Sequence, residues 1–347
     1  MHHPDYCIAG AGIIGLSLAL ELHRRGANVT VLERHTPLTE ASHAAAGMLA
    51  AHDPENPAQL QPLADLSVGL YSTYLAQIEA LSQLPIPYQT QITLQSHTTQ
   101  APHTFQPIEE KSIDPRQLAH SLLTAVYATT IDVRSNTPVQ SVIRLPNSIQ
   151  IQTPTTTLTA SHFIDCTGSW STITSHLPPF TVVPRKGQML AIALPHRLRL
   201  GTVLRTPSIY IVPRTQGPNA GRAIVGATIE DCGFDKSTHS ADITHLHTLA
   251  AQLIPELASA TVLETWAGLR PATVDGLPLL GALPGNPRHL LATGHYRNGI
   301  LLAPATAQLV AQLLLHESPS IDPLPYAPAR ILNPPESRSS NPLSNRS

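Results

Sequence analysis

The hydrophobic pattern at the start of the chain predicts a strand, a helix and a second strand. Residues Tyr6–Ala9 form a short apolar run, and residues Ile13–Arg25 carry apolar side chains at helical spacing. Gly26 follows this helix at the position where a glycine commonly ends one. Residues Asn28–Leu32 alternate as a strand that leads to Glu33. The chain is therefore expected to open with a β-α-β unit.

The rest of the chain alternates between helical and strand-like segments. Asp114 followed by Pro115 is typical of a helix start, so a helix is predicted from there to about Tyr127. Further helices are predicted at about 243–253 and from about 298 onward. Short apolar or alternating runs predict strands at 131–133, 139–145, 148–152, 163–166, 188–192, 208–212 and 289–292. The predicted fold is α/β, with a Rossmann-like domain interleaved with a strand-rich, antiparallel domain.

Each of the two expected domains takes several stretches of the chain. The Rossmann-like domain is expected to comprise residues 1–82, 114–178 and 265–332. The strand-rich domain is expected to comprise residues 83–113 and 179–264. Residues 333–347 are mostly Asn, Pro, Ser and Arg, so we expect a disordered tail there.

Composition and charge exclude several classes of protein. The chain has 347 residues, of which 42% are hydrophobic and 13% charged, with a formal net charge of -2. This length suffices to bury a core without disulfides or metals. A nucleic-acid partner is not expected, because such proteins usually carry a basic excess.

Membrane, secretion and metal signals are absent from the sequence pattern. The longest apolar stretch, Gly299–Leu315, is too short and too polar to cross a bilayer, and the first residues do not resemble a secretory signal. The three cysteines form no CxxC, which fits a reducing, cytoplasmic location. The 18 histidines show no metal-ligand spacing, so no metal is predicted.

The turn between the first strand and the first helix matches a dinucleotide-binding signature. Gly10, Gly12 and Gly15 have the GxGxxG spacing in a strand–turn–helix context. They would permit, in order, a tight turn, close approach of a pyrophosphate to the backbone, and close packing of helix on strand. The helix N-terminus favours the anion, and Glu33 is placed to accept hydrogen bonds from a ribose. The signature leaves NAD and FAD open, and Arg34 is expected at the solvent side or the adenine edge.

Two further segments are rich in small residues, which let backbone lie against a large planar ligand. The first is Ser42–Leu49, for which the start of an ordinary Ala-rich helix stays open as the alternative. The second is the strand that ends at Thr167 and Gly168. This strand is suited to pass close to the same nucleotide.

Several motifs stand in a fixed order along the chain. They are YCIAGAGIIG (6–15), ER (33–34), SHAAAGML (42–49), TPV (137–139), DCTGSW (165–170), RKGQ (185–188), YIVPR (210–214), IVGATIED (224–231), WAGLRPATVDGLPLLG (266–281) and GHYRNGILLAPATAQL (294–309). Through them the chain resembles the FAD-dependent amino-acid oxidases of the D-amino-acid oxidase superfamily, and within it the glycine oxidases of thiamine biosynthesis. The last two motifs are the most specific.

The resemblance implies FAD as the cofactor and assigns positions to it. It implies cofactor contacts at Ile13, Ile14, Glu33, Arg34, Ala41, Ser42, Ala46, Gly47, Met48 and Val139. It also implies a loop against the flavin ring, formed by His295, Tyr296, Arg297, Asn298, Gly299, Ile300 and Leu301.

The resemblance also places the substrate carboxylate on Arg270 and Arg297, with Tyr210 close by. A planar guanidinium binds a carboxylate through two hydrogen bonds and stays charged at every relevant pH. From the residues alone, a structural ion pair at either arginine stays open, as does simple core packing of Tyr210.

The function implied is oxidative deamination of glycine and other small amines or D-amino acids, in thiamine biosynthesis. Hydride passes from the substrate Cα to flavin N5, an imine is formed, and dioxygen reoxidises the flavin to give hydrogen peroxide. No side-chain acid or base is predicted, because the cofactor carries the chemistry. The expected partners are a small amino-acid or amine substrate and dioxygen, and a homo-oligomer stays open. The alternatives are a D-amino-acid dehydrogenase that passes electrons to a quinone, and a flavin-binding protein without turnover.

Overall fold

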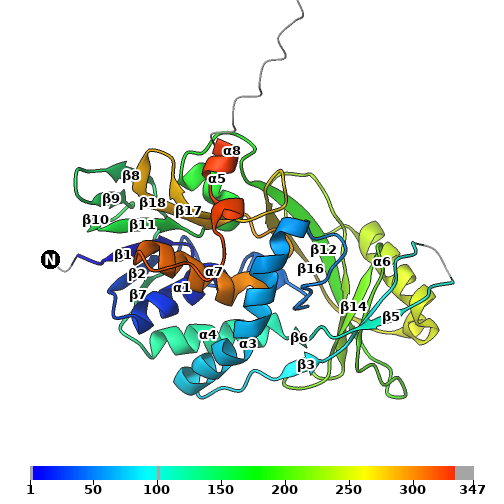
Figure 1. The fold of residues 1–347 in the computed structure, drawn as a ribbon. Coiled ribbons are helices and arrows are strands. Elements are labelled where there is room, and N and C mark those ends of the chain that lie inside the picture. The colour runs from blue at the N-terminus through cyan, green and yellow to red at the C-terminus, as the bar shows by residue number, and fades with distance from the viewer. Residues whose placement is uncertain (1–2, 100–101, 333–347) are drawn as a thin grey trace, which may run out of the picture.

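The computed structural model describes residues 3–99 and 102–332 and has two lobes, each built on its own sheet (Figure 1). The tail predicted for residues 333–347 lies outside the described residues. The first lobe contains a six-stranded sheet in the order β17 (Leu279–Leu283), β18 (Asn286–Thr293), β11 (His162–Asp165), β1 (Tyr6–Ala9), β2 (Val29–Leu32) and β7 (Asp132–Arg134). Its neighbouring strands run parallel, except for the antiparallel hairpin of β17 and β18.

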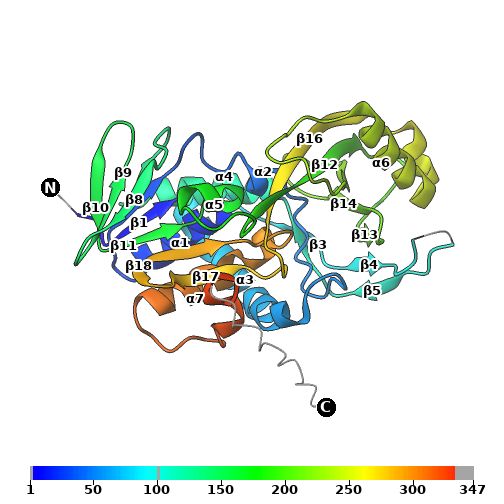
Figure 2. The same cartoon turned by 90° about the horizontal axis from the view of Figure 1, so that it is seen from above.

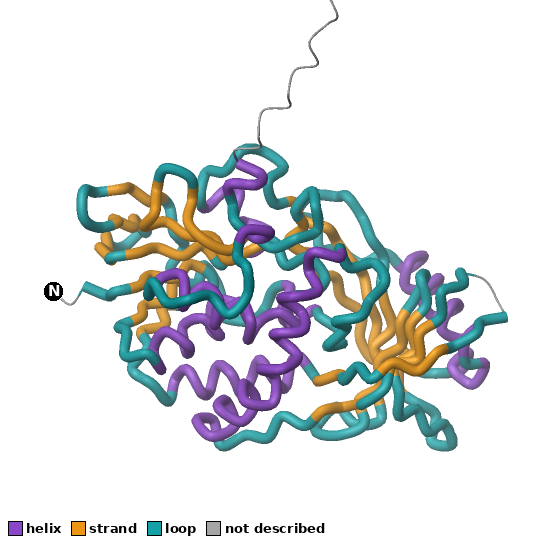
Figure 3. The backbone as a smooth tube through the Cα atoms, viewed as in Figure 1, coloured by secondary structure: helices purple, strands orange, loops and turns teal. Residues whose placement is uncertain are grey.

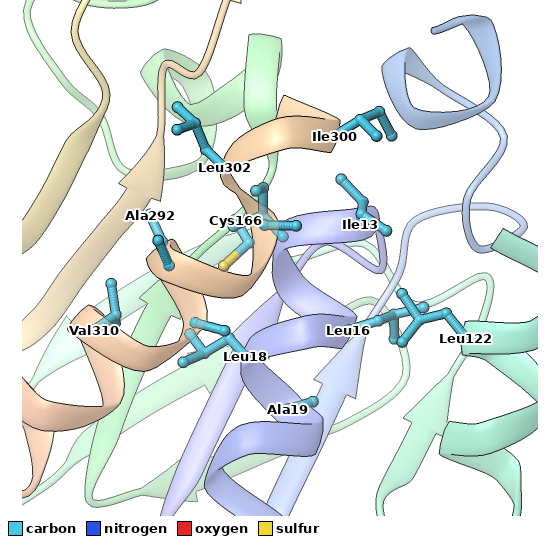
Figure 4. Close-up of a cluster of buried hydrophobic side chains, with 14 of the residues drawn as sticks. Ile13, Leu16, Leu18, Ala19, Leu122, Cys166, Ala292, Ile300, Leu302 and Val310 are labelled. Carbon is cyan, nitrogen blue, oxygen red and sulfur yellow. The ribbon is translucent and has the colours of Figure 1, made fainter. Parts of the chain in front are cut away.

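Helices cover one face of this parallel sheet and a small antiparallel sheet covers the other. The helices are α1 (Ile13–Arg24), α3 (Gln61–Ser82), α4 (Pro115–Tyr127) and α7 (Gly299–Leu314). Figure 4 shows Leu16 of α1 facing Leu122 of α4, with Val310 of α7 in the same buried cluster. The small sheet consists of β8 (Ser141–Arg144), β9 (Ile149–Gln152) and β10 (Thr157–Ala160). Cover on both faces explains why the four residues of β1 are all buried.

The second lobe is a seven-stranded sheet. Its order is β16 (Val262–Ala272), β12 (Val183–Ala193), β15 (Arg222–Gly226), β14 (Tyr210–Arg214), β13 (Val203–Arg205), β4 (Thr93–Gln95) and β5 (Gln106–Ile108). All neighbours are antiparallel except β13 and β4. Figure 2 shows the long strands β12 and β16 running from one lobe into the other.

Strand alternation gives the seven-stranded sheet two different faces. Ile211 and Val225 point to one face, where they pack with Leu246 of α6 (Ser240–Leu253). Val212 and Ile224, one residue away, point to the opposite face and pack with Ala46 and Met48 of the other lobe. Figure 3 shows α6 on the outer side of this sheet. The inner face therefore meets the first lobe.

Short elements complete the described chain. They are the helices α2 (Ala41–Ala44), α5 (Ser171–Thr174) and α8 (Ala329–Leu332), the paired strands β3 (Tyr88–Thr90) and β6 (Ser112–Ile113), and 3-10 turns at Ala58–Leu60, Gly168–Trp170, Pro255–Ser259 and Leu324–Tyr326. Within residues 3–99 and 102–332, no helix combines the length and the apolar character that a membrane span requires.

The α/β fold predicted from the sequence is confirmed, including the opening β-α-β unit and the antiparallel second sheet. The predicted start of α4 is also confirmed, because the Asp114 carboxylate accepts a hydrogen bond from the Arg116 N–H at 3.0 Å. Helix α3 was not predicted. The domain boundaries stay a prediction, and the one at residue 265 falls inside β16.

Candidate functional site

A cavity of about 360 Å³ is lined by residues of both lobes. This volume lies in the range of small-molecule sites. Its walls come from the carboxyl ends of β1, β2 and β11, the segment 40–50, strands β14 and β16, and the beginning of α7. The carboxyl ends of parallel strands are the usual place for a ligand in such a sheet.

Most residues that the sequence analysis singled out line this cavity. They are Gly10, Gly12, Ile13, Ile14, Glu33, Arg34, Ala41, Ser42, Ala46, Gly47, Met48, Val139, Gly168, Tyr210, Arg270, His295, Tyr296, Arg297, Asn298, Gly299 and Ile300. Gly15 and Leu301 are not among the lining residues. Leu301 is buried in the hydrophobic core, and Gly15 contacts the turn from behind, where an added Cβ would lie 2.0 Å from the Gly10 carbonyl oxygen.

The glycine-rich turn presents the N-terminus of α1 to the cavity. Gly10 has a φ of +98°, which L side chains rarely adopt. The first turn of α1 contains no acidic residue, and the Ile13 N–H donates to Ser42 Oγ at 3.0 Å. Glu33 is fixed beside the turn, because its Oε2 accepts from the Ala11 N–H at 2.8 Å. A positive helix end flanked by an oriented carboxylate suits a phosphate joined to a ribose.

The small-residue run is held against the inner face of the second sheet. It is helical only in α2, and Ala45 is already extended. Trp266 Nε1 donates to the Ala44 carbonyl at 3.1 Å, and Arg214 Nη2 donates to the Ala46 carbonyl at 2.8 Å. Desolvation lowers the pKa of the buried Arg214 to about 10, so its guanidinium stays charged at neutral pH. Larger side chains here would fill the space between the cavity and the sheet.

One end of the cavity is built around Arg34. Its Nη2 lies 2.9 Å from Glu40 Oε1, and its guanidinium carbon lies 3.5 Å from the centroid of the Trp170 ring. Phe234 from the second lobe also stacks on Trp170, with ring centroids 5.3 Å apart. The sequence analysis missed Glu40 and Trp170 as site residues, although Trp170 ends the motif DCTGSW.

The other end contains Arg270 and Tyr210. Arg270 Nη1 donates to the carbonyl oxygens of Lys186 at 3.3 Å and Thr228 at 3.2 Å. Within the described chain, its polar partners are these carbonyls and the neighbouring Tyr210 hydroxyl, and no carboxylate pairs with it, so its charge stays available to a ligand. Burial raises the pKa of Tyr210, while the nearby Arg270 and Arg214 lower it. The Tyr210 hydroxyl therefore keeps its proton.

Arg297 also lines the cavity, but its guanidinium is already paired with two carboxylates. Its Nη2 lies 2.9 Å from Asp53 Oδ2, and its Nη1 pairs with Glu55. Asp53 is itself a lining residue, and the sequence analysis did not identify it. The prediction that Arg297 binds the substrate carboxylate stays a prediction.

His295 and Asn298 fix the loop that leads into α7. His295 Nε2 and Thr306 Oγ1 lie 3.0 Å apart, and Asn298 Nδ2 donates to Asn56 Oδ1 at 2.8 Å. Desolvation lowers the pKa of His295 to about 3, so its ring is neutral at physiological pH. The N-terminus of α7 is thereby held at the cavity wall.

Comparison with known sequences finds relatives over most of the chain. The DAO family, described as FAD dependent oxidoreductase, matches residues 5–111 and 108–313. The bifunctional protein ThiO/ThiG of Nostoc sp. is 36% identical, over 92% of this chain and 54% of that protein. The chain thus spans about half the length of the first curated relatives it matches. The glycine oxidase of Pseudomonas aeruginosa is 30% identical, over 93% of this chain and 98% of that protein.

Solved structures share the fold. The crystal structure of glycine oxidase from Geobacillus kaustophilus superposes with a TM-score of 0.89 at 27% identity, over 95% of this chain and 99% of that chain. Iminodiacetate oxidase from Chelativorans sp. BNC1 superposes with a TM-score of 0.82 at 23% identity, over 93% and 98% of the two chains. At that identity the second likeness shows the fold alone.

Proposed function

Because the chain belongs to the DAO family of FAD-dependent oxidoreductases, we propose that it is an oxidase of glycine and other small amines or D-amino acids. The glycine oxidases among its relatives support this reaction class. A place in thiamine biosynthesis is part of the proposal and is supported by the similarity to the ThiO/ThiG proteins.

The observation that carries the proposal is the pairing of Arg270 with Tyr210 at one end of the cavity. Three guanidinium groups line the cavity, and two of them are ion-paired with carboxylates. Arg270 instead has neutral partners among the described residues, namely carbonyl oxygens and the protonated Tyr210 hydroxyl. A charged donor of this kind, next to a neutral donor, suits the carboxylate of an α-amino acid.

The cavity fits FAD, the cofactor of this family. The positive end of α1, the Glu33 carboxylate and the glycine turn suit a ribose and a pyrophosphate. The extended run after α2 suits a flat ring, because Ala45 and Ala46 present little more than backbone there. When bound, FAD supplies the electron acceptor for the amine and passes the electrons to dioxygen.

The chain's own residues bind and orient the substrate. Arg270 and Tyr210 hold the carboxylate, so the Cα of a small amino acid is fixed relative to the wall at Ala46. The acids and the histidine that line the cavity are already engaged. Glu33 accepts from backbone N–H groups, Glu40 pairs with Arg34, and Asp53 pairs with Arg297. The His295 ring is hydrogen-bonded to Thr306, and its pKa of about 3 makes it a weak base. This supports the proposal that no side-chain acid or base takes part.

The proposal is tested on the FAD-loaded protein with glycine, sarcosine and D-alanine. We expect hydrogen peroxide under air, and bleaching of the flavin absorbance by glycine without air. Bleaching without peroxide would favour the dehydrogenase that passes electrons to a quinone. A flavin that no amino acid bleaches would favour a binding protein without turnover.

Replacing Arg270 tests the carboxylate site directly. Arg270→Ala should lower kcat/KM for glycine roughly a hundredfold, which corresponds to about 3 kcal/mol. The effect should come mainly from a higher KM, because the substrate carboxylate loses its charged partner. The exposed Arg197→Ala serves as the control and should leave the kinetics unchanged. Amines without a carboxylate should respond far less to Arg270→Ala, and an equal loss for both classes would contradict the assignment.

A further inference from the structure

A network of five charged side chains lies against the same end of the cavity, and the proposed reaction does not use it. Its members are Asp53, Glu55, Glu110, Arg205 and Arg297. Asp53 is central, because its Oδ2 lies 2.9 Å from Arg297 Nη2 and 3.8 Å from Arg205 Nη1. Glu110 Oε2 lies 2.9 Å from Arg205 Nη2, and Glu55 pairs with Arg297.

Strand register places this network beside Tyr210. Arg205 of β13 and Tyr210 of β14 are direct partners in the antiparallel pair, so their side chains leave the same face of the sheet. On the other side of Tyr210, its β15 partner is Gly226, and Arg270 reaches the nearby Thr228 carbonyl. Tyr210 therefore lies between Arg270 and Arg205 on the sheet, and Asp53, which contacts Arg205, belongs to the cavity wall.

The charges of the network do not cancel. Two guanidinium groups face three carboxylates, which leaves one negative charge in excess. Three members have little solvent around them, with side-chain exposures of 8% for Asp53, 2% for Glu110 and 4% for Arg205. At such low exposure a neighbouring like charge is weakly screened.

Without Asp53, Arg297 would keep Glu55 on Nη1, but its Nη2 would be free at the cavity wall to bind an anion. Asp53 occupies that place from within the chain and adds its own negative charge to the cavity wall. A substrate held by Arg270 that carries a second carboxylate would meet Asp53 instead of a free guanidinium. Repulsion of an unwanted group is a common way to obtain specificity.

We propose that Asp53 is a specificity-determining residue that excludes substrates with a second carboxylate by neutralising Arg297 at the cavity wall. This inference rests on the proposed function, because it assumes that Arg270 holds the first carboxylate. In this proposal Arg297 belongs to the Asp53 network, and Arg270 and Tyr210 alone bind the first carboxylate of the substrate.

The test compares two substrates that differ by one carboxylate, sarcosine and iminodiacetate. The FAD-loaded wild-type protein should prefer sarcosine. In Asp53→Asn, the ratio of kcat/KM for sarcosine to that for iminodiacetate should fall by about tenfold or more, through a lower KM for iminodiacetate. Glu55→Gln is the matched control, since it also removes a carboxylate partner of Arg297 but leaves Asp53 in place, and it should keep most of the wild-type ratio.

Two results would overturn the proposal. One is a wild-type protein that accepts both substrates equally, and the other is an Asp53→Asn variant that loses activity on both in proportion, as a merely structural residue would. If Asp53→Asn does not fold, Arg297→Gln tests the same network in the opposite direction. It removes a cation beside Asp53, so the preference for sarcosine should increase, and an unchanged or reduced preference would contradict the proposal.

A binding measurement separates this inference from the proposed function. Calorimetric titration of the FAD-loaded protein with acetate and malonate requires no turnover. Malonate should bind Asp53→Asn about tenfold more tightly than it binds the wild type, while acetate binding should change little. If neither sarcosine nor glycine is oxidised but this difference is found, the proposed reaction is wrong and the role of Asp53 stands. Equal malonate affinities would reject the role of Asp53 alone.

Discussion

At the scale of single residues, the three guanidinium groups of the cavity differ by the partners they already have. Arg34 pairs with Glu40 and stacks on Trp170, so its place is fixed before any ligand binds. Arg297 is held by carboxylates. Among the described residues, Arg270 has no carboxylate partner, and it contacts the neutral Tyr210 hydroxyl and two carbonyl oxygens, each of the latter at more than 3 Å. Its charge is thus the least compensated, and a bound carboxylate would gain most there.

Burial of His295 should make the folded protein less stable in mild acid. Burial lowers the pKa of His295 to about 3, whereas the same ring in the unfolded chain titrates near 6.5, a value of about 6.5 being normal for an exposed histidine. The unfolded state therefore binds more protons between these values. This contribution to stability is present above about pH 6.5 and is lost as the pH falls, at about 1.4 kcal/mol per pH unit for each such group.

The measurement is urea unfolding, followed by circular dichroism, at several pH values between 7 and 4.5. His295→Asn should have a shallower loss of stability than the wild type. His289, whose pKa burial lowers to about 4, should keep part of the slope in that variant. The exposed His245→Asn is the control and should retain the wild-type slope. Parallel curves for His295→Asn and the wild type would show that the ring does not titrate as burial requires.

Which site residues the sequence could reveal depended on whether their signal is local. The glycine turn, Glu33 and the small-residue run belong to short patterns whose chemistry is legible from neighbours in the chain. Asp53 has no such signal, and although Trp170 ends the motif DCTGSW, the motif does not reveal that its ring stacks on Arg34. The partners of Asp53, Arg205 and Arg297, lie far along the sequence, and Arg205 is brought to it only by the meeting of the two lobes.

At the scale of elements, α7 has a break in its hydrogen-bond ladder that another helix repairs. Pro304 inside α7 has no N–H to donate to the Ile300 carbonyl. Tyr71 Oη of α3 donates to that carbonyl at 2.8 Å, and Ser67 Oγ donates to the Leu301 carbonyl at 2.6 Å. The two polar side chains thereby support the beginning of α7 at the cavity.

Removing one hydroxyl tests this support. Tyr71→Phe should lower the free energy of unfolding by about 1–3 kcal/mol, because the buried Ile300 carbonyl loses its donor. Chemical denaturation measures the change. Tyr127→Phe removes a hydroxyl from a side chain that is 57% exposed and should have almost no effect. A loss as large for Tyr127→Phe would mean that the Tyr71 hydrogen bond is not the cause.

The hydrogen bonds from Ser67 and Tyr71 to α7 explain why helix α3 was not predicted from the sequence. Its buried side chains include Ser67, Tyr71 and Ser82 among the apolar ones. Polar residues on the buried face weaken the helical hydrophobic pattern from which a helix is recognised. Their placement makes sense only with Pro304, which lies more than two hundred residues away in the chain.

The contact between α1 and the glycine turn gives a second prediction at this scale. Gly15→Ala would place a Cβ 2.0 Å from the Gly10 carbonyl oxygen, which is backbone and cannot rotate away. We expect a loss of stability of about 1–3 kcal/mol or more and a reduced flavin content, measured by the ratio of flavin to protein absorbance after purification. Gly69→Ala in α3 meets nothing within 4 Å and should instead be neutral or stabilising by about 1 kcal/mol. A full flavin content in Gly15→Ala would contradict the tight packing described.

At the scale of the whole molecule, each lobe supplies what the other lacks. The parallel sheet provides the glycine turn and the positive helix ends, while the antiparallel sheet provides Arg270 and Tyr210. The sequence predicted a helix-and-strand part interleaved with a strand-rich part, because helical and strand-like hydrophobic patterns differ. It did not predict the strand order, since the partners of β11, namely β1 and β18, are each more than a hundred residues away from it in the chain.

Strand β16 carries both Trp266, which anchors the Ala44 carbonyl, and Arg270, which faces the cavity. The spacing between the Ala44 carbonyl, near which the flavin ring would lie, and Arg270, which would hold the carboxylate, is therefore set by four residues of one strand. Asp53 and Arg205 lie outside β16, on a separate segment and a separate strand. Substitutions at Asp53 can therefore change which substrates are admitted without moving Arg270. We expect relatives with different substrates to differ around Asp53 before they differ in β16.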